Sequence, residues 1–158
     1  MSKFGSLVAD VSAPFKVSII DPITDLPITD SSGKRCYISV WASDSARSRA
    51  YEKQRRKDLV LRVKQSRNGQ VEPDDALEQN IAKCAHLVDS WYLVDRVSGE
   101  AIDVPCTPEN AADLLSEPGA GWIFLQVWVE ANSAANFLPK PAAPSAPMLS
   151  GTSETVAS

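Results

Sequence analysis

Cysteine and histidine are the residue types in this chain best suited to act as nucleophiles or soft metal ligands. There are three cysteines, Cys36, Cys84 and Cys106, and a single histidine, His86. Cys84 and His86 are two positions apart in a segment with helical periodicity, so their side chains do not share a helix face. The spacing therefore favours small core residues over a metal site or a catalytic dyad. Cys106 precedes an expected helix cap, and it is the one position where a thiolate would be favoured.

Sequence motifs of phosphate binding, dinucleotide binding and hydrolysis are absent from the chain. Neither GxxxxGK[ST], GxGxxG, HExxH nor GxSxG occurs. The carboxylates are scattered and do not form the spaced pairs that acid–base catalysis uses. We therefore expect no enzyme, no catalytic residues, no cofactor and no metal.

Composition indicates one ordinary globular domain. The chain has 158 residues, of which 44% are hydrophobic and 23% are charged. Its net charge of −4 argues against nucleic acid as the main partner. Widely spaced cysteines and the lack of a signal-peptide pattern or a long apolar run predict a reduced cytoplasm and no membrane association.

The N-terminal region has the alternation of an antiparallel β-hairpin. Apolar and polar residues alternate over 15–20 and again over 34–42, where Cys36, Ile38 and Val40 share one side. Two strands alone are marginally stable, so this hairpin needs a helix or a third strand to cover it, and residues 102–104 are the candidate for that strand.

A basic helix is predicted next, with Asp44 as its N-cap and Asn68–Gly69 at its end. Residues 47–67 carry nine Lys or Arg and two acids. Because its apolar residues lie in the second half, we expect a helix weakly anchored at its start that projects from the body. Such a surface suits an acidic protein partner better than DNA or RNA, since a charge run is usually a solvated face.

Two further helices are predicted around a short hairpin. An apolar stripe from Leu77 to Trp91, after Pro73 in the first turn, indicates an amphipathic helix. The chain then extends, turns at 95–100 and returns as a strand at 101–104. Thr107 caps the next helix, which ends at 117–119.

The last helix, over 121–137, is apolar almost all round and must be buried in the core or under a partner. Tryptophan is enriched at interface hot spots. We therefore expect partner contact from two sets of residues: Trp122, Phe124, Leu125 and Trp128 on this helix, and Arg47, Arg49, Arg55 and Arg56 on the basic helix.

The predicted fold class is α+β. A hairpin over 14–42 packs on a small bundle of about four helices over 43–138, forming a single domain over 14–138. Residues 1–13 are expected to be flexible. Residues 139–158 are rich in Pro, Ala and Ser and are expected to form a disordered tail.

The order of these segments resembles the tail assembly chaperones of long-tailed bacteriophages. "VSIIDPITDLPIT" looks like the first strand and turn of that family, and "ISVWASDSARSRAYEKQRR" looks like its strand followed by a base-rich helix. The stretch from "LVDSWYLVDRVSGEAIDVPCTPENAADLL" to "GWIFLQVWVEANSAANFL" is similar to its glycine turn, capped helix, leucine pair and Trp helix. The likeness covers residues 15–138.

The resemblance implies a non-enzymatic protein that binds the tape-measure protein and keeps it soluble during tail-tube assembly. It implies action in the host cytoplasm, absence from the mature virion, and tail-tube subunits as further partners. Many relatives are also made as a longer frameshifted product. Two alternatives stay open, a structural minor tail protein and, with less support, a nucleic-acid-binding regulator using residues 47–67. A homo-oligomer is also left open.

Overall fold

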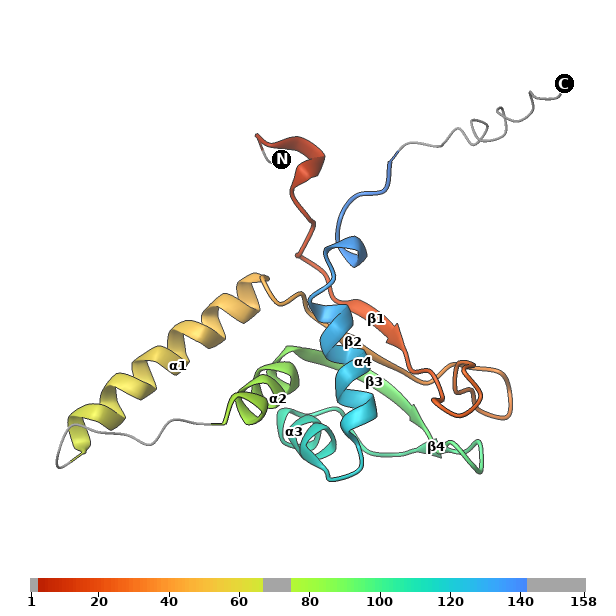
Figure 1. The fold of residues 1–158 in the computed structure, drawn as a ribbon. Helices are drawn as coiled ribbons and strands as arrows, with labels where there is room; N and C mark the ends of the chain where they lie inside the picture. The colour runs from red at the N-terminus through yellow and green to blue at the C-terminus, as the bar shows by residue number, and fades with distance from the viewer. Residues whose placement is uncertain (1–2, 67–74, 142–158) are drawn as a thin grey trace, which may run out of the picture.

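The computed structural model describes residues 3–66 and 75–141. The expected helix end at 68–69, the helix start at Pro73 and residues 142–158 of the expected tail lie outside the described residues. The elements in order are η1 (Gly5–Leu7), β1 (Phe15–Ser18), β2 (Tyr37–Val40), α1 (Ala46–Gln65), α2 (Ala76–Leu87), β3 (Val88–Val94), β4 (Ala101–Ile102), α3 (Pro108–Ser116), α4 (Gly121–Ala131) and η2 (Ala134–Asn136), where η denotes a short 3-10 helix (Figure 1). The predicted α+β class is confirmed.

The described strands form one antiparallel sheet in the order β1–β2–β3–β4. The expected pairing of the first two strands is confirmed. The prediction that residues 102–104 cover this hairpin is wrong, because Ile38 lies opposite Trp91 of β3. Ile102 instead pairs with Leu93 on the far side of β3. With seven residues, β3 is long enough to pair along both of its edges.

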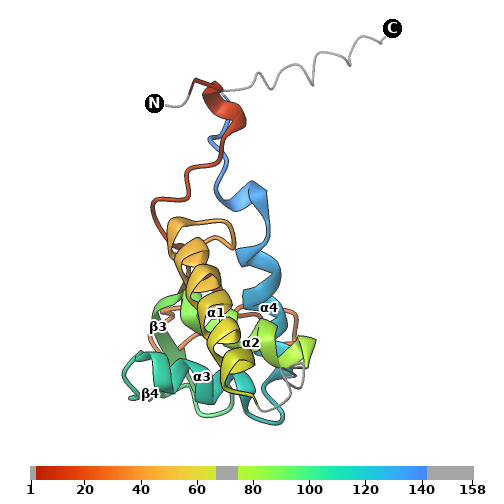
Figure 2. The ribbon, with the colours of Figure 1, turned by 90° about the vertical axis from the view of Figure 1, so that its left-hand side faces the viewer.

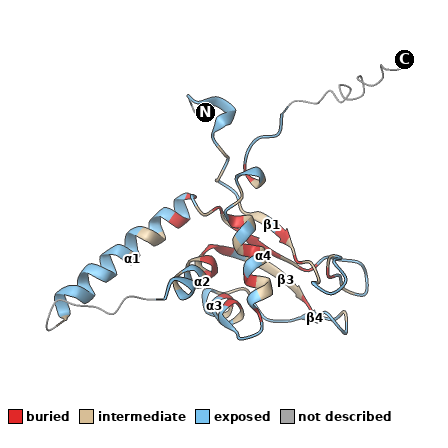
Figure 3. Ribbon diagram, in the orientation of Figure 1, coloured by how far each residue is buried: buried red, intermediate tan, exposed pale blue. Residues whose placement is uncertain are grey.

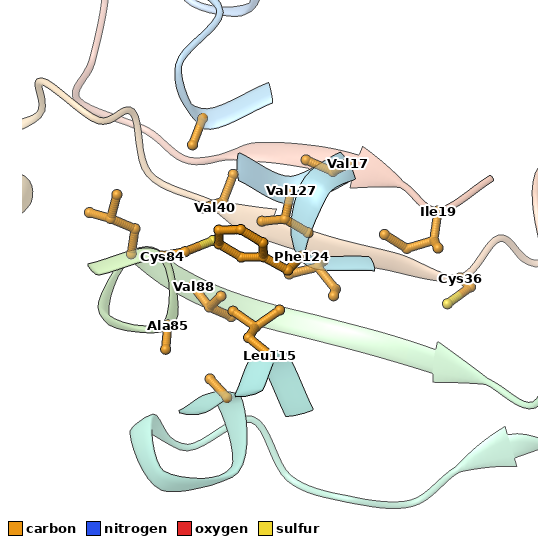
Figure 4. Close-up of a cluster of buried hydrophobic side chains, with 14 of the residues drawn as sticks. Val17, Ile19, Cys36, Val40, Cys84, Ala85, Val88, Leu115, Phe124 and Val127 are labelled. Atoms are coloured by element: carbon orange, nitrogen blue, oxygen red, sulfur yellow. The ribbon is translucent and has the colours of Figure 1, made fainter. Parts of the chain in front are cut away.

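Alternation along the strands places the core on one face of the sheet. Cys36, Ile38 and Val40, which were predicted to share one side, are all buried. Helix α4 crosses this face in front of β1 and β2 and contributes Phe124 and Val127 to the same cluster (Figures 1 and 4). In Figure 2, α2 and α4 lie together on one side of β3. The core therefore lies between the sheet and the helices.

Helix α1 begins one residue later than predicted. Its N-cap is Ser45 and not Asp44, and the Ser45 side chain accepts a hydrogen bond from the Ser48 backbone N–H at 3.3 Å. Ser45 and Ser48 are both buried, whereas Asp44 is exposed. Small hydroxyl side chains thus allow the helix start to approach the body closely.

Helix α2 ends earlier than predicted, at Leu87 and not at Trp91. The Trp41 backbone N–H donates to the Leu87 carbonyl at 2.9 Å, and Val88 has extended backbone angles. Pairing with the edge of β2 competes with continuation of the helix, and the chain joins that edge as soon as it leaves α2. Val88 and Trp91 fit a helical stripe by spacing, but they face the core from a strand.

Helix α4 is also shorter than predicted. It ends at Ala131, and η2 covers part of the remaining segment up to Phe137. The Asn132 side chain donates to the Trp128 carbonyl at 2.8 Å and so satisfies one of the last helical acceptors.

Helix α1 projects from the body, as predicted (Figures 1 and 3). However, the first half of the helix is the anchored one, although it was expected to be the weakly anchored half. Its first turns are held by buried Ser48 and by Tyr51, whose ring lies 4.6 Å from the His86 ring, centroid to centroid. The apolar residues of its second half, Leu59, Val60, Leu61 and Val63, are exposed. The expectation failed because α1 contacts α2 near the start of the helix, through Arg47, Tyr51 and Glu52.

Candidate partner-binding site

The position of α4 is set by the turn that follows α3. Thr107 caps α3 as predicted, and its hydroxyl accepts a hydrogen bond from the Asn110 backbone N–H at 3.1 Å. Beyond the helix, Gly119 has a φ of 97°, a left-handed conformation that favours glycine. This turn reverses the chain, so Trp122 at the start of α4 lies beside Leu114 near the end of α3.

An apolar pocket of about 200 Å³ opens between the sheet, α3 and the start of α4. Buried Ile19 and Ile38 line it, together with partly exposed Ile102, Leu114 and Trp122. An engineered protein cavity of roughly 150 Å³ is large enough to bind benzene. The pocket therefore has room for one large apolar side chain.

Charges beside the pocket are paired or hydrogen-bonded. The Arg96 guanidinium lies 3.3 Å from the Asp21 carboxylate. Asp95 accepts hydrogen bonds from the backbone N–H groups of Ser98 and Val97, and these bonds hold the pKa of Asp95 below its usual range. The site therefore favours an apolar side chain over a charged one.

The four residues predicted for contact on α4 do not form one surface. Trp122 lines the pocket, and Leu125 is 58% exposed on another side of the helix. Phe124 is buried in the core, and the Trp128 ring stacks on it at a centroid distance of 5.9 Å. A partner can thus reach Trp122 or Leu125, while Phe124 stabilises the protein itself.

The first two predicted arginines make contacts at the base of α1. Arg47 donates through Nε to the His86 carbonyl at 3.0 Å and so links α1 to α2. Arg49 donates to the Asp44 carbonyl at 3.3 Å, close to the helix start. Both side chains are exposed, so each still presents charge to solvent.

The other two predicted arginines lie about two turns further along α1. Arg55 lies 3.2 Å from Glu52, and the other oxygen of Glu52 lies 3.2 Å from Lys83 of α2. Arg56 is exposed. The basic helix therefore combines attachment to α2 with an exposed cationic surface.

The cysteines and the histidine lie in packing positions. Burial raises the pKa of Cys84 to about 12 and also raises that of Cys36. Burial and the nearby Asp89 carboxylate raise the pKa of Cys106. This environment disfavours the thiolate that the position of Cys106 before a helix cap had suggested. Burial, and then the Arg47 charge, lower the pKa of His86.

Sequence reasoning missed two polar side chains that hold distant segments together. Asp30 accepts hydrogen bonds from the Tyr92 hydroxyl at 2.6 Å and from backbone N–H groups of its own turn, and its pKa is strongly lowered, chiefly by the Tyr92 bond. Gln126 binds the backbone of Ile20 at both ends of its amide. The signal in the sequence for Gln126 was an amide within the otherwise apolar run 122–129.

Two features are absent from residues 3–66 and 75–141. No group of three or more His, Cys, Asp or Glu is placed to hold a metal ion there. Within the same residues, no helix combines the length and apolar character needed to cross a membrane. Comparisons of the chain with protein-family models, with curated proteins and with solved structures find no match.

Proposed function

We propose that this protein is a non-enzymatic chaperone of phage tail assembly, which binds the tape-measure protein and keeps it soluble until the tail tube forms. The proposal combines the ordered likeness of residues 15–138 to that family with the apolar pocket at the start of α4. It assigns the protein to the host cytoplasm and not to the mature virion. Tail-tube subunits are further candidate partners.

The pocket beside Trp122 is the observation that carries the proposal. A long helical client exposes apolar side chains at spacings of three and four residues, and one such side chain fills a pocket of this size. Burying one large apolar side chain contributes roughly 1.5–3 kcal/mol. Individually weak contacts, repeated by many copies along one client, suit a protein that holds its client reversibly.

The exposed basic side chains of α1 supply a second contact. Arg56 and its neighbours Lys53 and Lys57 are exposed on a helix that projects from the body (Figure 3). They fit acidic segments of the client or of tail-tube subunits. Because exposed charges are screened by salt, this contribution weakens at high ionic strength, whereas the pocket contact persists.

Co-purification with the tape-measure protein tests the proposed site. Ile102 lines the pocket and is 42% exposed, so Ile102→Glu places a carboxylate there without entering the core. We expect this variant to recover about tenfold less client than the wild type, a difference of about 1.4 kcal/mol. Val97→Glu is the matched control, because Val97 is 86% exposed in the neighbouring turn and does not line the pocket. Equal recovery with both variants would contradict the proposed site.

Mass spectrometry of purified phage particles separates the chaperone from a structural tail protein. The proposal predicts that the chain is absent from finished particles and present in lysates before tail completion. Finding it in stoichiometric amounts in the particle would instead support a minor tail subunit.

A further inference from the structure

Strand β1 is an outer strand of the sheet, so half of its backbone hydrogen-bonding groups point away from β2. The Ile19 N–H donates to the carbonyl of Cys36, the residue before β2, at 3.0 Å. This N–H therefore points toward the β2 side of the strand. Because backbone groups alternate in direction along an antiparallel strand, those of Lys16 and Ser18 point outward. β1 thus presents the donors and acceptors that an added strand requires.

Gln126 of α4 ends this open stretch at one side. Its Oε1 accepts from the Ile20 N–H at 2.8 Å, and its Nε2 donates to the Ile20 carbonyl at 2.8 Å. The amide thus occupies the outward groups of Ile20 as a neighbouring strand would. It also shows that α4 reaches the outer edge of β1.

The overhang of α4 forms an apolar groove beside β1, with a volume of about 420 Å³. Leu125 and Val129 line it and are 58% and 60% exposed. They are four residues apart and share one helix face. Among the lining residues only Glu130 is charged, and it accepts a hydrogen bond from the Asn136 side chain at 2.7 Å. An added strand would lie beneath an apolar roof.

We propose that a second copy of this chain occupies the edge, with β1 pairing antiparallel to its counterpart about a twofold axis. Around a centre at Val17, Lys16 of one copy lies opposite Ser18 of the other, so the outward backbone groups of both residues bond reciprocally. The same axis brings Leu125 and Val129 of the two copies together.

Self-pairing satisfies both features of the edge at once. A helical partner would leave the strand groups of β1 without hydrogen bonds, whereas a twofold interface matches strand to strand and apolar helix face to apolar helix face. The Lys16 ammonium lies 4.3 Å from the centroid of the Tyr37 ring, on the sheet face away from the core, so it stays clear of the groove.

The proposed dimer leaves the Trp122 pocket open, since the groove and the pocket share no lining residue. Two copies joined in this way present two pockets in a fixed relation. The dimer itself does not depend on the chaperone function. A short strand and two side chains per copy form a small interface, so we expect a weak dimer that dissociates in the micromolar range.

Sedimentation equilibrium of the full chain over about 1 μM to 1 mM tests the proposal. The wild type is expected to shift from the protomer to twice the protomer mass. Ser18→Pro removes an outward N–H without removing a bond to β2, and Leu125→Glu charges the groove, so both variants should remain protomers. Leu61→Glu is the matched control, because Leu61 is 54% exposed on α1, and it should dimerise like the wild type.

Hydrogen exchange at the backbone amides of Lys16 and Ser18 distinguishes the possible occupants of the edge. Protection that rises with protein concentration supports the dimer. A wild type that stays protomeric at every concentration overturns it. A dimer that persists in both Ser18→Pro and Leu125→Glu, or that is lost in Leu61→Glu, also overturns it. Concentration-independent protection that disappears when residues 142–158 are deleted also overturns it, by assigning the edge to the chain's own C-terminal segment.

Discussion

At the scale of single residues, His86 shows how packing sets chemistry. Its ring lies against Tyr51, its carbonyl accepts from Arg47, and its pKa is lowered first by burial and then by the Arg47 charge. A depressed histidine pKa means that the unfolded state binds the proton more readily. Stability should therefore fall as the pH drops through the ordinary value of 6.5.

We expect NMR titration of His86 to give a pKa below 6.5. Because the chain has one histidine, the imidazole signal needs no further assignment. Arg47→Gln should raise this pKa by removing a nearby positive charge, while Arg56→Gln, at an exposed position, should leave it unchanged. A pKa at or above 6.5 in the wild type would show that the ring is not packed as described.

The start of α1 depends on one hydroxyl group. Ser45→Ala should lower the free energy of unfolding by about 1 kcal/mol, because it removes the cap that accepts from the Ser48 N–H. Asp44→Ala should change it by less than about 0.5 kcal/mol, since the exposed Asp44 contributes its backbone carbonyl to Arg49 and not its side chain. Urea unfolding of the two variants measures the difference, and a larger loss for Asp44→Ala would restore the N-cap predicted from sequence.

At the scale of elements, adjacent residues of α4 have different roles, since Phe124 packs in the core and Leu125 lines the exposed groove. Phe124→Ala should cost about 3–5 kcal/mol by leaving a cavity in the core between α4 and the sheet. Leu125→Ala should cost less than about 0.5 kcal/mol in the protomer, because the side chain is largely exposed. Thermal unfolding at low protein concentration compares them, and similar losses would mean that α4 is oriented differently.

The elements also show how far sequence patterns reach. Alternation at Cys36, Ile38 and Val40 predicted the strand and the side that these residues share, because burial on one side of a sheet enforces period two. The structure shows that this side is the buried one. The end of α2 was not predictable from spacing, since Val88 and Trp91 satisfy a helical stripe as well as a strand. Pairing with the edge of β2 ended the helix at Leu87.

The candidate site was predicted only in part, for a similar reason. Trp122 was identified from its residue type, but the pocket also needs Ile102 and Leu114, which only the tertiary fold brings beside it. The anchored half of α1 likewise depends on Tyr51 meeting His86 of another helix. Local periodicity does not predict which side chains of different elements come into contact.

At the scale of the whole molecule, a compact α+β body carries three separate surfaces. These are the Trp122 pocket, the cationic face of α1 and the outer edge of β1 under α4. Their separation allows self-association and client binding to occur together. If the dimer forms, it presents two pockets, and under the proposed function avidity then strengthens weak contacts along a repetitive client.

Co-expression with the tape-measure protein tests the central claim most directly, by measuring how much of that client stays in the soluble fraction. The wild-type chain is expected to keep most of the client soluble, Val97→Glu should match it, and Ile102→Glu should leave most of the client in the pellet. If the client is equally soluble with the wild-type chain and with no chain at all, the chaperone function is contradicted.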